Sequence, residues 1–339
     1  MFRFSIVLLL LGLAITLEGC NKAGASGPPP ALTEIRLGYF ANVTHAQAVL
    51  GVASGDFQNS LGSITLKTKV FNAGPALMQA LNAGEIDIGY VGPGPVISAY
   101  ANSHGASVRV LAGAAANGVG IVARKDSGIS SLKDLVGKKI ATPQLGNTQD
   151  VSARHYVTAV LGEADPNNVL AIPNSQQSGM MLRGKIDAAW APEPWASRLI
   201  VDTGAVLIGE EKDLWPGNRF SLTVVVTSPK FLAEHADVVE KILAVHHQWT
   251  LRLSQNPHAY GDQLNTALSA LTGMKLPGSV LQGAMDRTQF TDDALEQTFA
   301  TMGQWSADLK FIPAAPDLTG LFQTDIIRKL SAGSTLAAR

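Results

Sequence analysis

The amino-acid sequence predicts an α/β protein built from two similar lobes. Short apolar strands alternate with helical segments, a pattern typical of right-handed βαβ units and parallel sheets. The alternation restarts after Asn117-Gly118, and a length of 339 residues favours two compact domains. Residues 81–93 and 181–193 also share one pattern, running from a helix end through Gly and Ile-Asp to an apolar strand, an aromatic residue and a turn with Pro. Chance similarity between two ordinary turns is the alternative explanation of this repeat.

Strands in the first part of the chain are indicated by alternating or apolar residues, and helices by the residues at their starts. Residues 34–40 alternate, Thr44 is placed to cap the helix that follows, and Pro75 lies at a helix start, where its missing N–H costs nothing. We therefore expect strand 34–40, helix 45–53, strand 64–71, helix 74–81, strand 86–91, helix 95–100 and strand 108–112.

The second part of the chain repeats this alternation with shorter elements. Its strands are indicated by short, mostly apolar runs of three to six residues. The chain after Pro229 is predicted to be mostly helical. We expect strand 119–123, helix 131–135, strand 139–141, helix 148–161, strand 169–172, helix 176–182, strand 186–190, helix 193–201 and strand 222–227.

The first 20 residues are typical of an export signal. Residues 6–17 are almost wholly apolar, yet too few to span a bilayer, which takes about 20 residues. The only cysteine of the chain, Cys20, follows this run as in the lipobox of bacterial lipoproteins, although Glu18 departs from that pattern. We expect a signal peptide at 1–19, lipidation of Cys20 and a flexible tether at 20–30. A plain secretory signal with an incidental cysteine is the alternative.

Composition and motif searches exclude several functions. The 26 Lys and Arg against 27 Asp and Glu give a net charge of −1, which excludes a strongly basic nucleic-acid surface. One cysteine excludes an internal disulfide and a CxxC metal or redox site. No G-x-S-x-G or HExxH motif is present, and the neighbouring His246 and His247 would point to different faces of a helix. We therefore expect no enzyme activity, no cofactor and no metal.

Polar turns after the predicted strands indicate a binding site. Ligands of open α/β sheets bind at the carboxyl ends of strands, where helix N-termini present unpaired N–H groups to anions. These turns contain no Lys or Arg, which favours a weakly basic oxyanion such as a sulfonate, sulfate or nitrate. Capping of the helices alone is the alternative for each turn. The candidate ligand-binding residues are Asn42, Thr44, His45, Asn72, Gly74, Gly92, Pro93, Gln144, Gly146, Asn147, Thr148, Trp190 and Glu193.

Two of these candidates have alternatives of their own. Trp190, at a strand end, is placed either to wall a pocket for an apolar tail or to pack in the core. Glu193 is placed either to contact an amine of a ligand or, as we favour, to cap the following helix.

Several of these strings resemble those of periplasmic substrate-binding proteins of ABC importers for aliphatic sulfonates, taurine and nitrate. The resemblance extends over nearly the whole chain after residue 30. It implies a type II two-lobed clamp that the chain crosses twice, with lobe one at 31–117 and 226–339 and lobe two at 118–225. Asn117-Gly118 and residues 219–222 are then hinge candidates. The matching strings are 37–47 (LGYFANVTHAQ), 71–75 (FNAGP), 86–93 (IDIGYVGP), 141–150 (ATPQLGNTQD) and 189–195 (AWAPEPW).

The resemblance implies a monomeric, extracytoplasmic receptor that is not an enzyme and that delivers a small anion to an ABC permease and its ATPase. An aliphatic sulfonate is the ligand we favour. Nitrate or bicarbonate, a thiamine-precursor pyrimidine, and a sensing role remain alternatives. So does an exported enzyme on the same clamp, which would need His45, His104 and His155 to converge.

Overall fold

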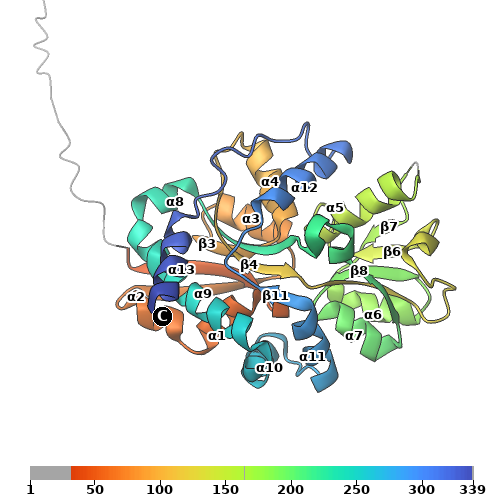
Figure 1. Cartoon of the computed structure of the whole chain (residues 1–339), viewed down its shortest axis with the longest axis horizontal. Coiled ribbons are helices and arrows are strands. Elements are labelled where there is room, and N and C mark those ends of the chain that lie inside the picture. The colour runs from red at the N-terminus through yellow and green to blue at the C-terminus, as the bar shows by residue number, and fades with distance from the viewer. Residues whose placement is uncertain (1–31, 164, 338–339) are drawn as a thin grey trace, which may run out of the picture. The chain divides into compact units, whose positions relative to one another are not determined.

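The computed structural model describes residues 32–163 and 165–337, and residues from Thr33 onward form one compact unit (Figure 1). The expected signal peptide at 1–19, the lipidation site Cys20 and the tether at 20–30 lie outside the described residues. Within the described part of the chain, no helix combines the length and the apolar character needed to cross a membrane.

The first of two sheets has six strands, in the order β11-β4-β10-β3-β1-β2. Strand β1 pairs in parallel with β2 and β3, as βαβ units require. Strand β10 instead runs antiparallel to β3 and β4, and β11 runs antiparallel to β4. The strands are β1 (Glu34–Phe40), β2 (Thr65–Phe71), β3 (Ile88–Val91), β4 (Arg109–Asn117), β10 (Ser221–Thr227) and β11 (Thr288–Phe290).

The second sheet has five strands, in the order β7-β6-β8-β5-β9. Strand β6 pairs in parallel with β7 and β8, whereas β5 runs antiparallel to β8 and β9. We refer to each sheet with the helices that cover it as a lobe, the first with six strands and the second with five. The strands of the second are β5 (Val119–Ala123), β6 (Ile140–Thr142), β7 (Val169–Ala171), β8 (Ala188–Pro192) and β9 (Val206–Glu210).

The predicted parallel pairing is confirmed within each sheet, but it is wrong for β5 and β10. Each is the strand by which the chain enters one sheet directly from the other lobe. A parallel neighbour requires a crossover connection, usually a helix, and neither strand is joined to its neighbours in that way. Both sheets are mixed as a result.

The helices begin close to the predicted starts. Helices α3 and α5 begin at the expected residues, but the expected helix 148–161 continues after α5 as a π-helical turn (Tyr156–Val160). Helix α2 and strands β9 and β11 were not predicted. The helices are α1 (Ala46–Ala53), α2 (Asp56–Leu61), α3 (Gly74–Asn82), α4 (Pro93–Asn102), α5 (Thr148–His155), α6 (Asn174–Leu182), α7 (Trp195–Thr203), α8 (Pro229–Glu234), α9 (Ala236–Gln255), α10 (Gly261–Thr272), α11 (Gly278–Arg287), α12 (Glu296–Asp308) and α13 (Asp325–Ala337).

The chain changes sheet at Asn117 and Gly118, which both have left-handed backbone conformations, with φ of 62° and 73°. It returns between the end of β9 at Glu210 and the start of β10 at Ser221. The expected boundary at 225/226 falls inside β10. The lobe boundaries themselves stay predictions.

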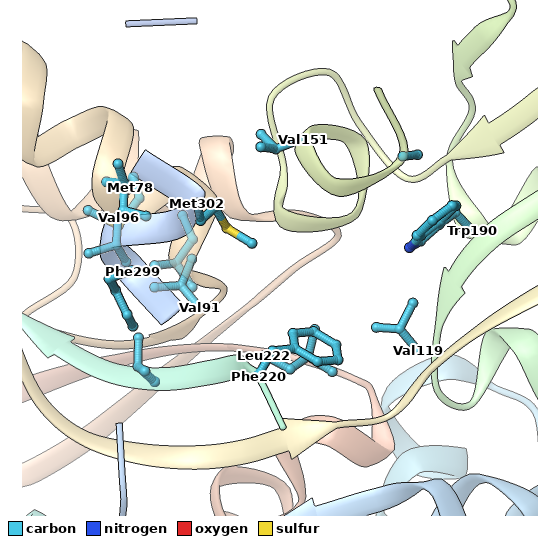
Figure 2. Packing of buried hydrophobic residues seen from close by; sticks show 14 of the residues in the cluster. Met78, Val91, Val96, Val119, Val151, Trp190, Phe220, Leu222, Phe299 and Met302 are labelled. Carbon is cyan, nitrogen blue, oxygen red and sulfur yellow. The ribbon is translucent and has the colours of Figure 1, made fainter. Parts of the chain in front are cut away.

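Buried apolar side chains of both sheets form one continuous cluster. Figure 2 shows Phe220 and Leu222, at the return into the first sheet, between Val91 on one side and Val119 and Trp190 on the other. This packing makes the residues that connect the sheets part of the core.

The carboxyl group of Glu211, in the second lobe, is completely buried. Its oxygens accept hydrogen bonds from Ser152 Oγ at 2.6 Å, Trp190 Nε1 at 2.6 Å and Trp215 Nε1 at 3.3 Å. These three donors are neutral, so burial dominates and raises the pKa of Glu211 from 4.5 to about 7.

Replacing Glu211 should change how stability depends on pH. Between pH 4.5 and 7 the unfolded chain loses this proton and the folded chain keeps it, so the native protein loses roughly 3 kcal/mol of stability as pH rises. Glu211→Gln removes that loss. Urea unfolding from pH 4.5 to 8 should therefore show the variant gaining stability relative to the native protein as pH rises. The exposed control Glu240→Gln should follow the native protein. Parallel curves for native protein and Glu211→Gln would contradict the account.

Candidate functional site

A pocket of about 420 Å³, part of it open to solvent, lies between turns of the two lobes. It lies beyond the carboxyl ends of strands, where the sequence predicts a site. Phe40, Pro95, Pro143, Pro192 and Leu222 contribute apolar surface to it. The candidate residues that line it are Asn42, Thr44, His45, Asn72, Gly74, Gly92, Asn147 and Thr148.

The lining carries no ionised side chain among the described residues. The residues that surround the pocket include no Lys, Arg, Asp or Glu. Its one titratable group is His45, which is buried. Burial lowers the pKa of His45 to about 3, so its imidazole is neutral near pH 7.

His45 offers a single donor. The backbone N–H of Phe40 donates to His45 Nδ1 at 3.4 Å, which leaves the proton of the neutral ring on Nε2. A neutral N–H at the pocket wall can bind an anion, and it cannot form an ion pair.

Helix starts surround the pocket and supply further donors. No side chain in the described residues caps the turn Val43–His45, α3 or α6. Helix α5 is capped by Asn147, whose Oδ1 accepts a hydrogen bond from Asp150 N at 2.8 Å. The N–H groups of Thr148 and Gln149, in the same first turn, remain available to a ligand. Because the first N–H groups of a helix have no partner within the helix, these starts are a candidate site for an anion bound by neutral donors.

The start of α4 has a different role. Pro93 and Pro95 have no N–H, and Gly94 N donates to Thr148 Oγ1 of the second lobe at 3.2 Å. A Cβ on Gly92 would lie 2.3 Å from the same Thr148 oxygen. Helix α4 therefore contributes a close contact between the lobes, and Gly92 permits that approach.

Two side-chain amides of the lining, those of Asn42 and Gln149, donate no hydrogen bond to the described residues. Asn42 Oδ1 accepts from Trp195 Nε1 at 2.9 Å, and Gln149 Oε1 accepts from Asn147 Nδ2 at 3.0 Å. Each carbonyl is occupied, so the NH₂ groups of Asn42 and Gln149 are left for a ligand.

Five candidates lie outside the pocket lining. Pro93 begins α4, and Gln144 and Gly146 shape the turn before α5, where Gly146 has a φ of 72°. Trp190 packs in the core and donates to Glu211, which corresponds to the packing alternative. Ligand contact by these residues stays a prediction, as it does for Glu193.

Glu193 takes part in contacts within and between the lobes. Its carboxylate accepts from Ser197 N in the first turn of α7 at 3.2 Å, as expected for a capping residue. It also accepts from Arg287 Nε at 2.6 Å, at the end of α11. Desolvation raises the pKa of Glu193 and Arg287 opposes that shift. The charge of this buried carboxylate is thus balanced outside the pocket.

Sequence reasoning missed Gln149, Asn174 and Arg287. Gln149 lies within one of the matching strings, and Asn174 is the first polar residue after β7, so the strand-end rule applies to both. Arg287 has no local signal, because its partner Glu193 is distant in the sequence.

The three histidines that an enzyme on this clamp would need do not converge. His45 lines the pocket, His104 follows the end of α4, and His155 stacks on Trp305 with ring centroids 4.1 Å apart. In residues 32–163 and 165–337, no group of three or more His, Cys, Asp or Glu side chains is placed to hold a metal.

Known proteins share both the sequence pattern and the fold. A protein of Bacillus subtilis (strain 168), provisionally named an aliphatic sulfonates-binding protein, is 27% identical over 317 residues, or 92% of this chain and 91% of that protein. The alkanesulfonate-binding protein of Xanthomonas axonopodis pv. citri, solved with bound MOPS, aligns with a TM-score of 0.70 and 22% identity over 87% of this chain and 99% of its own. The periplasmic nitrate-binding protein of Synechocystis PCC 6803 aligns with a TM-score of 0.73 and 14% identity over 89% of each chain.

The fold is thus the two-lobed clamp of periplasmic binding proteins. The sequence profile of the NMT1-like family matches residues 28–260. That match extends over more than half of the 339 residues, and the chain therefore belongs to the NMT1-like family.

Proposed function

We propose that this protein is the solute-binding component of an ABC importer and captures an aliphatic sulfonate in the pocket between its lobes. It then delivers the ligand to a membrane permease with an associated ATPase. The observation that carries the proposal is an uncharged pocket surrounded by uncapped helix starts from both lobes. The names of the Bacillus and Xanthomonas relatives support the same ligand class.

The donor set favours a weakly basic monoanion. A sulfonate spreads one charge over three oxygens and accepts hydrogen bonds from neutral donors. A phosphonate or phosphate carries a proton or a second charge near neutral pH, and its sites usually contain Arg or an acceptor for that proton. The described lining contains no Arg, and no carboxylate that could accept that proton.

The apolar part of the lining favours a ligand with a tail. Phe40, Pro95 and Leu222 would pack against methylene groups, whereas nitrate and bicarbonate have nothing to place there. The nitrate-binding relative keeps nitrate as the second candidate.

Capture follows from contacts that exist only when the lobes are together. A ligand shifts the balance towards the closed state by the difference between its contacts in the two states. The donors of α3 and α5 belong to different lobes, so an anion held by both supplies that difference. The left-handed residues Asn117 and Gly118 are the proposed hinge.

Binding of a ligand panel tests the proposal. Thermal unfolding and calorimetry with short alkanesulfonates, nitrate, sulfate, a phosphonate and a thiamine pyrimidine should give tightest binding for an alkanesulfonate. Sulfonate affinity should be the same at pH 5.5 and 8, because burial keeps the pKa of His45 near 3 and no other lining group titrates in that range. Binding of another class alone, without any sulfonate, would refute the ligand assignment.

Closure is tested at Gly92. The variant Gly92→Ala places a Cβ against Thr148, so sulfonate affinity should fall about tenfold or more. Adding Thr148→Ala removes the obstructing oxygen and should restore part of that loss. The control Gly278→Ala, whose Cβ would meet no atom within 4 Å, should bind normally. Native affinity for Gly92→Ala would show that this contact has no part in capture.

We also propose that the mature protein is a monomer anchored outside the cytoplasm by a lipid on Cys20. Full-length protein expressed in a bacterium should fractionate with membranes, and Cys20→Ala should move it to the soluble fraction. Globomycin should cause precursor to accumulate for the native chain only. Equal fractionation of both chains, with no globomycin effect, would indicate a plain secretory signal instead.

A further inference from the structure

The described lining of the pocket contains no carboxylate that could pair with a positive charge on the ligand. The closest acidic residues in the sequence to its lining are Asp150 and Glu193, and both are buried with other partners. Asp150 accepts from Thr142 Oγ1 at 2.7 Å and from Arg154 Nε at 2.9 Å. Glu193 is paired with Arg287. Neither carboxylate lines the pocket.

The helix starts act against a cation as well. Their partial positive charge stabilises the oxyanion and repels an ammonium group in the same small volume. A buried ammonium without a carboxylate loses its hydration and gains no ion pair. An amino-terminated sulfonate such as taurine is therefore a poor ligand for this lining.

One neutral acceptor in the lining is unused. Asn174, at the start of α6, has a buried carbonyl oxygen Oδ1 with no hydrogen-bond partner among the described residues. Buried polar atoms are nearly always hydrogen-bonded, so such an atom in a ligand pocket calls for a donor from the ligand. The carbonyl oxygen of the Asn174 side chain, unlike the backbone N–H groups at the same helix start, cannot donate to the oxyanion. It can only accept from another group of the ligand.

Resting on the proposed function, we propose that the pocket selects sulfonates whose far end is an uncharged hydrogen-bond donor such as a hydroxyl, and that Asn174 contacts that end. Three ligands of equal length isolate the effect of the group at the far end. Isethionate, propane-1-sulfonate and taurine differ only in a terminal hydroxyl, methyl or ammonium group.

Calorimetry of the native protein with these three ligands is the first test. Isethionate should bind about tenfold more tightly than propane-1-sulfonate, because it supplies the missing hydrogen bond. Taurine should bind about 100-fold more weakly than isethionate. Equal affinity for taurine and isethionate would overturn this inference and leave the sulfonate proposal intact. Failure of all three to bind would overturn both.

Two substitutions of Asn174 are the second test. Asn174→Leu should weaken isethionate about tenfold and leave propane-1-sulfonate unchanged or tighter. Asn174→Asp adds a carboxylate to the lining, so the ratio of taurine to propane-1-sulfonate affinity should rise about tenfold or more. The control Asn102→Asp, with the same charge at the exposed end of α4, should leave that ratio unchanged.

The Asn174 side chain is only half-buried, so both variants should fold. The thermal midpoint of each variant without ligand checks this. If Asn174→Leu weakens all three ligands equally, Asn174 serves the oxyanion through its NH₂ group, and the inference is wrong.

Discussion

The hydrogen bond from Gly94 N to Thr148 Oγ1 is the contact on which the pocket depends, because it joins the start of α4 in one lobe to the start of α5 in the other. The sequence around it permits the approach. Gly92 has no Cβ to strike the Thr148 oxygen, and the prolines on either side of Gly94 leave no further N–H groups unpaired at this junction. The proposed donors for a ligand are therefore those of the neighbouring helix starts, which line the same pocket.

The charged side chains near the pocket lie outside its described lining. Glu193 is paired with Arg287, and Asp150 is paired with Arg154. Glu211 accepts hydrogen bonds only from neutral donors and forms no ion pair with them, and burial raises its pKa to about 7. A buried carboxylate is tolerated when its charge is paired or its proton is retained. An anion bound in the pocket would meet helix dipoles and amide donors, and no carboxylate of the described lining would oppose it. The neutral His45 fits the same arrangement, since a charged imidazole would be buried without a carboxylate partner.

The elements that could be predicted are those specified by local pattern. Strand β1 alternates, α3 begins with a proline in its first turn, and the repeat at 81–93 and 181–193 locates β3 and β8. Eight of the candidate residues that were chosen by the strand-end rule line one pocket, and their contact with a ligand stays a prediction. The features that could not be predicted from the local pattern depend on contacts between residues distant in the sequence. The antiparallel pairing of β10, the short strand β11 on β4 and the Arg287 partner of Glu193 arise only when the two lobes assemble. Trp190 was ambiguous for the same reason, because its donor role depends on the buried Glu211.

The central claim is that an anion is held here by neutral N–H groups of helix starts in both lobes. A crystal structure of the protein with a bound alkanesulfonate tests it most directly. The account predicts sulfonate oxygens within hydrogen-bond distance of backbone N–H groups at the starts of α3 and α5, with no Lys or Arg side chain in contact. A sulfonate bound by Lys or Arg, or bound to one lobe alone, would contradict it.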